Sequence, residues 1–366
     1  MSSKLIEFLE KSKSSSRDVE AGVHVVLGNE ACDLDSAVCS VVYAFFLHNM
    51  DGNEKIFLPV LNIPRADFPL RTEITYTFAR FGINLKDLVF TDEFDMTALK
   101  TKGELAVTLV DHNLLARHQQ GLISVLVEVI DHHKDELAPH VKKTIEPVGS
   151  CSTLIAEKIL SNKPDLLDNQ VTGLLLSAIL LDSVNLDPRA GRMTPKDQHI
   201  VQALQDKVKF NLEELYHSVN EAKFDVSGLT SAEILRKDYK AVPLYPGNPA
   251  RVGISSIGLP LQGFLKREGI SQCLLQFCTS KGINTLVVMA MYFESRDGPP
   301  LRQVYVCGPD ETSASKLARF LRDNDQLKLN AIKIDLPEGF CFDQMNIKAS
   351  RKVVFPLVMN FLKVAV

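Results

Sequence analysis

The chain has 366 residues, of which 45% are hydrophobic and 23% are charged, and its formal net charge at pH 7 is -4. This length suits two domains of ordinary size, and the composition is that of a globular protein. Because the charges form no basic stripe and no apolar run reaches the ~20 residues of a membrane span, we expect neither nucleic acid nor a membrane as partner.

The seven cysteines are odd in number and include no C-x-x-C pair. This usage argues against a disulfide framework or a zinc ribbon and favours reduced thiols. The N-terminal segment also lacks the apolar core of a secretory signal. The sequence therefore predicts a cytoplasmic protein.

In the first half of the chain, short apolar runs alternate with amphipathic segments. We predict strands over 23–27, 55–61, 87–90, 105–111 and 125–131. Helices are predicted between them, over 36–49 and 71–82. The strands show no clean polar alternation, which is typical of strands covered on both faces. This order predicts an α/β fold with a mainly parallel sheet flanked by helices.

Further helices are predicted before and within the second half. They cover 150–163, the apolar segment around Asp182, 194–208, 211–224 and 231–240. Strands are expected over 250–257, 284–293 and 301–307, the last two as a hairpin. The composition becomes more polar near 206–211, so we predict two domains there, 1–207 and a smaller α/β domain 208–366, with a hinge between them.

Three strand ends carry acids or imidazoles. The stretch GNEACDLDS places Asp33 and Asp35 one residue apart, LVDHN contains Asp111, and VIDHH ends on His132 and His133. Because ligands bind beyond the carboxyl ends of parallel strands, these segments are expected to converge. One capping Asp would be ordinary at a helix start, but capping does not account for the whole set. Carboxylates and imidazoles suit Mg²⁺ or Mn²⁺ ions, which activate water for phosphoryl hydrolysis.

These stretches, followed in order by EPVGSCSTL, MTPKD, EAKFDVSGLT, LRKDYK and SRK, resemble the DHH phosphoesterase superfamily in its DHHA2-containing branch. That branch includes family II inorganic pyrophosphatases and cytosolic exopolyphosphatases. The resemblance extends over nearly the whole chain. It implies an N-terminal DHH domain, a smaller C-terminal DHHA2 domain and an active site in the cleft between them.

The resemblance also implies roles for the matching residues. One or two Mn²⁺ or Mg²⁺ ions would be held by Asp33, Asp35, Asp111, His132 and Asp182, with Asp111 as the bridge. His133 would face the phosphate, with Asp131 orienting an imidazole. Asn29 stands where the pyrophosphatases have a histidine ligand, which favours an exopolyphosphatase.

Five further residues match substrate-binding positions of the family: Lys196, Lys240, Ser350, Arg351 and Lys352. Cations there would hold phosphates and neutralise charge in the transition state. The last three also fit a plainer interpretation, in which Ser350 caps a helix whose first turn is solvated. Both interpretations stay open from the sequence.

We therefore predict a metal-dependent phosphohydrolase that releases orthophosphate from short-chain inorganic polyphosphate. One alternative is a cyclic-nucleotide (cAMP) phosphodiesterase using the same site. Another is a regulator with weak catalysis, whose partners by resemblance would be nucleoside diphosphate kinase and glycogen synthase kinase. In the family these partners bind an acidic tail that this sequence, ending at Val366, does not show, so we favour the enzyme. By resemblance, part of the protein is also expected in the nucleus, besides the predicted cytoplasmic location.

Overall fold

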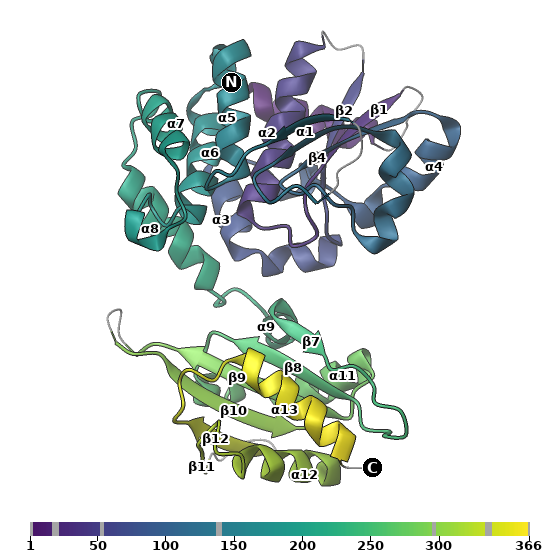
Figure 1. Cartoon of the computed structure of the whole chain (residues 1–366), viewed down its shortest axis with the longest axis vertical. Helices are drawn as coiled ribbons and strands as arrows, with labels where there is room; N and C mark the ends of the chain where they lie inside the picture. The colour runs from purple at the N-terminus through teal and green to yellow at the C-terminus, as the bar shows by residue number, and fades with distance from the viewer. Residues whose placement is uncertain are drawn as a thin grey trace. The chain divides into compact units, whose positions relative to one another are not determined.

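The computed structural model describes residues 3–16, 22–51, 55–136, 141–294, 298–333 and 339–364. The chain divides into two compact units, Met1–Asp225 and Val226–Val366 (Figure 1). Each unit has its own six-stranded sheet. None of the helices within the described ranges combines the length and the apolar character needed to cross a membrane.

The sheet of the N-terminal unit is entirely parallel. Its strands lie in the order β3 (Val89–Phe90), β2 (Ile56–Leu61), β1 (Val23–Leu27), β4 (Leu105–Val110), β5 (Leu126–Asp131) and β6 (Lys142–Ile145). Five of these confirm predicted strands, and β6 was not predicted. From β1 the chain builds outward first to β2 and β3, then returns to place β4 on the other side of β1.

Alternate side chains of these strands enter two hydrophobic cores. Val26 and Val110 belong to the core under the larger helical layer, whereas Val25, Leu27 and Leu109 face the other side. The helices of the larger layer are α1 (Lys4–Ser15), α2 (Leu34–Met50), α3 (Thr72–Arg80), α5 (Cys151–Asn162), α6 (Asn169–Asp182), α7 (Pro195–Gln205) and α8 (Leu212–Phe224). The other face is covered by α4 (Met96–Lys102) and the 3₁₀ helix η4 (Arg117–Val125).

Short 3₁₀ helices complete the N-terminal unit. They are η1 (Arg65–Leu70), η2 (Leu85–Asp87), η3 (Thr91–Glu93), η5 (Pro164–Leu166) and η6 (Pro188–Ala190). The unit ends after α8, later than the predicted boundary at 207/208, because α8 packs on α3 and α6. The predicted hinge at 206–211 therefore lies inside the N-terminal unit.

The C-terminal unit has a mixed sheet. Its strands lie in the order β11 (Leu329–Ala331), β12 (Phe340–Gln344), β10 (Leu301–Cys307), β9 (Thr285–Tyr292), β8 (Val252–Ile257) and β7 (Tyr239–Ala241). β8 and β9 are parallel, and the other neighbours are antiparallel. The pairing of β9 with β10 confirms the predicted hairpin.

Helices pack against this sheet. α12 (Glu311–Arg322) and α13 (Arg351–Val364) share a core with alternate residues of β8, β9 and β10. The remaining helices are α9 (Ser231–Lys237), α10 (Leu261–Leu265) and α11 (Ile270–Lys281), of which α9 contacts β8 and α10 contacts β10. The predicted helix over 231–240 is three residues too long, because Tyr239–Ala241 pairs with β8 as an edge strand.

A candidate metal centre at the carboxyl edge of the parallel sheet

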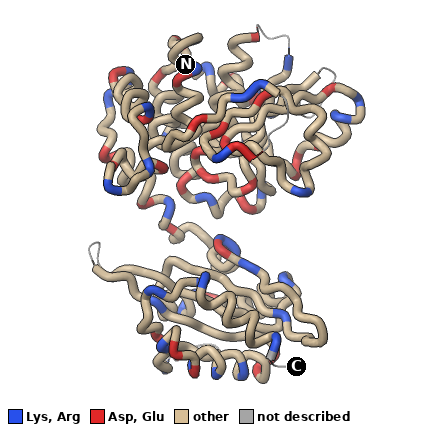
Figure 2. The backbone as a smooth tube through the Cα atoms, in the orientation of Figure 1, with Lys and Arg blue, Asp and Glu red and all other residues tan. Residues whose placement is uncertain are grey.

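The site residues gather where the strand order reverses. β1 and β4 are neighbours, and β5 follows β4, so the loops after these three strands leave the sheet at one edge. This is the crevice in which open α/β sheets bind their ligands. Several Asp and Glu positions lie along the backbone in the middle of the N-terminal unit (Figure 2). The predicted convergence of the three strand-end motifs is therefore present.

The first loop is pressed closely against α2. A Cβ atom on Gly28 would lie 2.2 Å from Oγ of Ser36, so only glycine fits there without displacement. The Asn29 N–H donates to the same Ser36 Oγ at 2.7 Å. Asp33 is exposed and caps α2 by accepting a hydrogen bond from the Ser36 N–H, 3.1 Å from Oδ1. The capping interpretation of Asp33 is thus correct, and it leaves Oδ2 for another partner.

Asp35 is 2% exposed and faces the start of α5. Its Oδ2 accepts from the Cys151 N–H at 2.6 Å, and its Oδ1 accepts from the N–H and hydroxyl of Ser152 at 2.9 and 2.6 Å. A carboxylate at a helix N-terminus is stabilised by the unpaired N–H groups and by the helix dipole. The motif Gly149–Thr153 therefore holds this carboxylate in place.

Asp111 occupies the centre of the site in a left-handed backbone conformation, with φ of 62°. Asn29 donates from Nδ2 to Asp111 Oδ2 at 2.7 Å, which orients the carboxylate. The other oxygen, Oδ1, is buried and accepts no hydrogen bond from any described residue. Burial raises the pKa of Asp111 well above its ordinary value, and the charges of Asp35 and Asp33 add to the shift. Such an oxygen lacks a compensating positive charge.

His132 points its Nε2 at these acids. Its Nδ1 lies 2.9 Å from the Val148 carbonyl, so Nδ1 carries a proton and the neutral ring presents Nε2 as a ligand atom. Burial opposes protonation of His132, but the charge of Asp35 and the bond to Val148 outweigh it and raise the pKa of the ring. Nε2 is 3.2 Å from Asp111 Oδ1 and 3.9 Å from Asp35 Oδ2. A histidine whose second nitrogen is held by a carbonyl is typical of metal ligation.

His133 is oriented by Asp131. Its Nδ1 is 2.8 Å from Oδ1 of Asp131, a fully buried carboxylate that also accepts the N–H groups of His132 and His133. The hydrogen bond that His133 donates to Asp131 raises the pKa of His133, whose side chain is 59% exposed. One potential ligand atom each from Asp111, His132 and His133 lie within 4.8 Å of one another. His133 therefore lies nearer the centre than a purely phosphate-facing residue requires.

Asp182 is the last residue of α6. Its Oδ2 is buried and, within the described part of the chain, has no hydrogen-bond partner. Burial raises the pKa of Asp182 well above its ordinary value, and Asp35, Asp33 and Asp111 raise it further. Asp182 thus adds a second carboxylate oxygen, without a partner among the described residues, to the same cluster.

The donor set fits a divalent cation. Two buried carboxylate oxygens that have no hydrogen-bond partner among the described residues, Asp111 Oδ1 and Asp182 Oδ2, belong to this cluster. An imidazole nitrogen of His132, whose other nitrogen bonds to a carbonyl, belongs to it as well. Without a positive ion, several carboxylates in one place raise one another's pKa, as they do here. Oxygen and imidazole ligands together suit Mn²⁺ or Mg²⁺.

The predicted basic residues have different surroundings. Lys196 Nζ is paired with Glu146 at 2.6 Å and with Glu157 at 3.0 Å, so its charge is already used within the N-terminal unit. Arg351 donates to the carbonyl and to Oδ1 of Asp238 at 2.7 and 2.6 Å. The sequence alone did not indicate these pairings.

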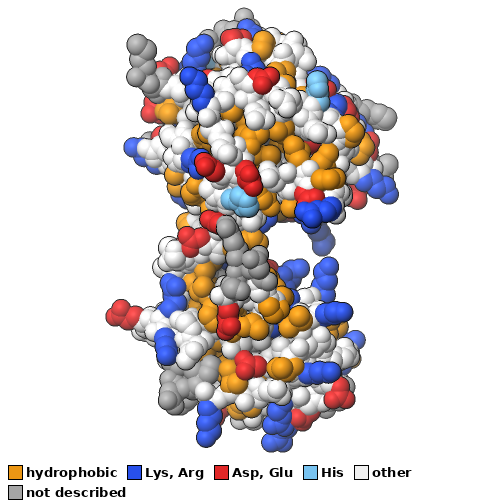
Figure 3. Space-filling model, turned by 90° about the vertical axis from the view of Figure 1, so that its left-hand side faces the viewer, with side chains coloured by type: hydrophobic (Ala, Val, Ile, Leu, Met, Phe, Trp, Pro, Cys, Tyr) orange, Lys and Arg blue, Asp and Glu red, His pale blue; other side chains and the backbone are white. Residues whose placement is uncertain are grey.

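The other C-terminal residues of the predicted set are exposed or half-buried. Lys240 and Lys352 are exposed, and neither forms an ion pair with a described residue. Ser350 precedes α13, and its Oγ accepts from the Lys352 N–H at 3.3 Å, which agrees with the capping interpretation. Lys and Arg side chains are spread over the face of the C-terminal unit that Figure 3 shows.

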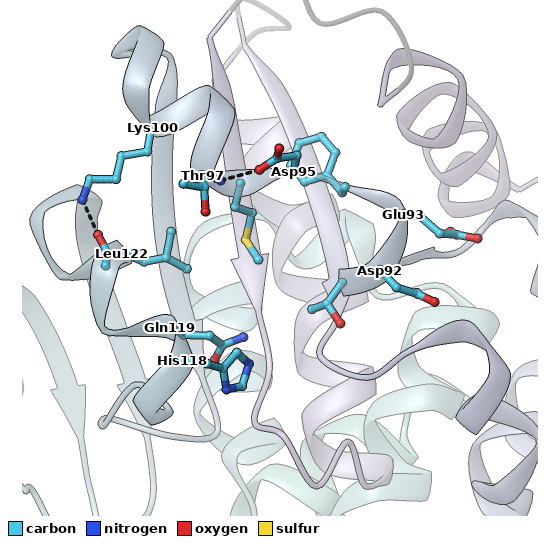
Figure 4. Close-up of a pocket in the computed structure, with 12 residues that line it drawn as sticks. Asp92, Glu93, Asp95, Thr97, Lys100, His118, Gln119 and Leu122 are labelled. Atoms are coloured by element: carbon cyan, nitrogen blue, oxygen red, sulfur yellow. Dashed lines mark hydrogen bonds between the residues drawn. The ribbon is translucent and has the colours of Figure 1, made fainter. Parts of the chain in front are cut away.

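A cavity of about 590 Å³ opens between η3, α4 and η4 (Figure 4). It lies beside residues 28–33, the loop between β1 and α2 that carries Asp33, which we call the first metal loop. His118 on its wall is 3.5 Å from Glu30 of that loop. Its other polar groups are largely engaged: Asp95 caps α4, Glu93 pairs with Lys13 and Lys100 bonds to the Gly121 carbonyl. None of the carboxylates of the candidate metal centre lines this cavity.

Sequence reasoning also missed Asp197. This fully buried carboxylate accepts from the Gly149 N–H at 2.8 Å, the Thr153 hydroxyl at 2.6 Å and the Thr194 N–H at 2.7 Å. It joins the MTPKD stretch to the loop before α5, which holds Asp35. The Thr-Pro-Lys-Asp sequence indicated only the start of a helix, and the structure shows that Thr194 and Asp197 form a capping box there.

Comparisons with known proteins match both units. The DHH family, N-terminal domain, matches residues 24–179, and the DHHA2 domain matches residues 217–361. The chain is 38% identical over 348 residues to "Exopolyphosphatase PRUNE1" of Bos taurus, covering 93% of this chain and 76% of the relative. Identity to the Homo sapiens protein of that name is 37%, with the same coverage. A "Manganese-dependent inorganic pyrophosphatase" of Methanocaldococcus jannaschii is 27% identical over 277 residues, covering 72% of this chain and 81% of the relative.

Proposed function

Because this chain belongs to the DHH family with a DHHA2 domain, alongside the PRUNE1 exopolyphosphatases, we propose that it is a metal-dependent exopolyphosphatase. Its substrate would be short-chain inorganic polyphosphate, from which it releases orthophosphate. The observation that carries the proposal is the buried Asp111 Oδ1, which has no described hydrogen-bond donor and lies 3.2 Å from the fixed His132 Nε2. A site of this kind needs a cation to be stable.

Asp33, Asp35, Asp111, His132 and Asp182 would hold one or two divalent ions. When bound, such ions supply an activated water and neutralise charge on the phosphoryl oxygens. Manganese is the metal named for the pyrophosphatase relative, and we propose Mn²⁺ ahead of Mg²⁺ for this chain. Asn29 would act as a positioning residue, because its amide fixes the Asp111 carboxylate at 2.7 Å.

His133 is suited to proton transfer. Its hydrogen bond to Asp131 holds the ring in one orientation and favours the protonated form. A protonated imidazole beside the metal cluster stabilises negative charge on phosphoryl oxygens and can protonate the departing phosphate. No residue of the chain needs to form a covalent bond with phosphorus in this scheme.

We propose that Lys240, Ser350, Arg351 and Lys352 bind the phosphates remote from the metal ions. The exposed cations are available to an anion, and the start of α13 attracts negative charge. Arg351 would have to exchange or share its Asp238 partner on binding. Lys196 is the weakest of the predicted set, because two glutamates already neutralise it.

Polyphosphate hydrolysis accounts for the site without a cyclic-nucleotide phosphodiesterase activity. We keep nucleoside diphosphate kinase and glycogen synthase kinase as predicted partners only. A cytoplasmic location, with a nuclear pool, is likewise proposed, supported by seven cysteines of which none forms a disulfide.

The test is phosphate release from tripolyphosphate with Mn²⁺, with Mg²⁺ and with a chelator. Asp111→Asn is the informative variant, because Asn tolerates the left-handed backbone and keeps the bond to Asn29. We expect activity to fall by more than ~100-fold, since loss of outer partners of metal ligands already costs ~10–100-fold. Asp165→Asn, at an exposed position of the same unit, is the matched control. Full activity in chelator or in Asp111→Asn would overturn the proposal.

A further inference from the structure

Arg71 stands out among the cations of the N-terminal unit. It lies between η1 and α3, where its N–H bonds to the Phe68 carbonyl and its own carbonyl accepts from the Ile74 and Thr75 N–H groups. Its Nε is buried, and no described residue accepts a hydrogen bond from it. A buried donor of a charged group without a partner is costly unless a ligand supplies the acceptor.

The segment that carries Arg71 is tied to the first metal loop. It begins at Asn62, which follows β2 and donates from Nδ2 to the Gly28 carbonyl at 2.8 Å. Cys32 of the loop and Leu34 at the start of α2 share a core with Phe68 of η1 and with the buried residues of α3. Arg71 is therefore anchored on both sides next to the loop that presents Asp33.

A second cation reaches the same place from α8. The Thr72 hydroxyl donates to the Lys223 carbonyl at 3.2 Å, which links the start of α3 to the end of α8. Lys223 is exposed and forms no ion pair with a described residue. Both helices belong to the N-terminal unit, so this junction does not depend on the C-terminal unit.

The charges of both residues act on Asp33. The positive charges of Lys223 and Arg71 both interact with the Asp33 carboxylate, which agrees with the anchoring of these two segments near the loop after β1. Arg65, by contrast, lies in the same connecting segment but is neutralised by Glu93. Arg71 and Lys223 are thus uncommitted cations beside a predicted metal ligand.

We propose that Arg71 and Lys223 form an anion subsite within the N-terminal unit, which binds phosphoryl oxygens of the polyphosphate beside Asp33. The inference rests on the proposed function and adds two substrate-binding residues. Arg71 lies outside every stretch quoted above for the family, and Lys223 lies in EAKFDVSGLT, to which no binding role was assigned. A polyphosphate brings more negative charge than one or two divalent ions neutralise. Charge-assisted hydrogen bonds from Arg and Lys compensate phosphoryl oxygens effectively, and Arg does so with two parallel donors.

The subsite can be tested by binding, independently of turnover. The probe is imidodiphosphate, a pyrophosphate analogue that is not hydrolysed, titrated calorimetrically into the Mn²⁺-loaded full chain. Arg71→Gln and Lys223→Gln should each weaken its binding by ~10-fold or more, the size expected for one lost charge-assisted hydrogen bond. Mn²⁺ binding, measured separately without the analogue, should change little, because neither residue is a proposed ligand.

Arg80→Gln is the matched control, because it removes the same charge from the far end of α3, where Arg80 bonds to Tyr76 and Ser218. Arg71→Lys should retain part of the affinity if charge rather than shape is required. Lys223→Gln guards against misfolding, since its exposed side chain holds no structural bond to a described residue.

Unchanged imidodiphosphate binding in both glutamine variants, with normal Mn²⁺ binding, would overturn the subsite. A protein that binds imidodiphosphate in an Arg71-dependent way but does not hydrolyse tripolyphosphate would support the subsite and refute the exopolyphosphatase. The two proposals therefore fail by different results.

Discussion

Removing the charge of Asp111 should stabilise the metal-free protein. The Asp111 Oδ1 and Asp35 Oδ2 atoms lie 3.2 and 3.9 Å from the same His132 nitrogen, so they can be at most 7.1 Å apart (3.2 plus 3.9). At an effective dielectric constant of 20, two ionised carboxylates at that separation repel each other by about 2 kcal/mol. Asp111→Asn removes this repulsion while keeping the Asn29 hydrogen bond.

In chelator at pH 8, we expect the Asp111→Asn protein to be about 2 kcal/mol more stable than the wild type. For a unit of this size, that corresponds to a melting temperature about 4–8 °C higher. Mn²⁺ should then favour the wild type. At a concentration 100-fold above its dissociation constant, the ion adds about 2.7 kcal/mol to the wild type. A variant that binds ~10–100-fold more weakly gains only about 0.4–1.4 kcal/mol at the same concentration.

Thermal unfolding followed by circular dichroism or calorimetry, with chelator and with Mn²⁺, measures both differences. The stability gap seen in chelator should close to within ~1 kcal/mol when the metal is added. Asp165→Asn should behave like the wild type in both conditions. A variant less stable than the wild type in chelator, or an equal gain from Mn²⁺ in both proteins, would refute a carboxylate cluster that requires a cation.

Three further predictions concern the scaffold. Burial lowers the pKa of His24 to about 4, so the unfolded chain binds a proton at this ring at a higher pH than the folded chain does. The free energy of unfolding should therefore fall by about 3 kcal/mol as pH drops from 6.5 to 4. In denaturant titrations, His24→Gln should show a smaller fall, and His217→Gln, at an exposed position, should show the same fall as the wild type. Gly28→Ala should cost about 2 kcal/mol because its Cβ would collide with Ser36 Oγ, and Ser36→Ala in the same chain should recover part of that loss. Asp197→Ala should lower the free energy of unfolding, measured by chemical denaturation, by about 3 kcal/mol or more, because it leaves several buried donors without an acceptor.

Each of these predictions has an outcome that contradicts it. An acid dependence identical in His24→Gln and wild type would mean that this ring is not buried in its neutral form. Wild-type stability in Gly28→Ala would show that the loop can move away from α2. A loss below 1 kcal/mol in Asp197→Ala would show that water replaces the carboxylate readily.

Much of the fold could be predicted because it depends on local patterns. Uninterrupted Val, Leu and Ile runs indicated the buried parallel strands, and the Thr194 and Pro195 signals located the start of α7. β6 escaped prediction because its sequence, Lys-Lys-Thr-Ile, is an edge strand with little apolar character. The division between the units was placed too early, because the polar stretch at 206–211 reflects a surface turn rather than the end of packing.

For the candidate site, the sequence indicated the metal-binding acids and imidazoles better than the substrate-binding cations. Strand ends with Asp and His indicated the metal cluster. In the structure, carboxylate oxygens of Asp35 and Asp111 both lie within 4 Å of His132 Nε2. The basic residues could not be ranked from sequence, because a lysine's availability depends on its neighbours in space. Lys196 is neutralised by two glutamates that are distant in sequence. Arg71 belongs to no recognisable motif, and its buried Nε has no acceptor among the described residues.

The order of residues along this chain was sufficient to determine a parallel α/β architecture, the family and the chemical nature of the centre. These follow from hydrophobic periodicity and from which residue types stand at strand ends, both of which are properties of short segments. Only the tertiary structure decided which charges are compensated. Coulomb energy depends on distance and burial, and the partners of Asp35, Lys196 and Arg351 come from segments that the linear sequence does not place beside them.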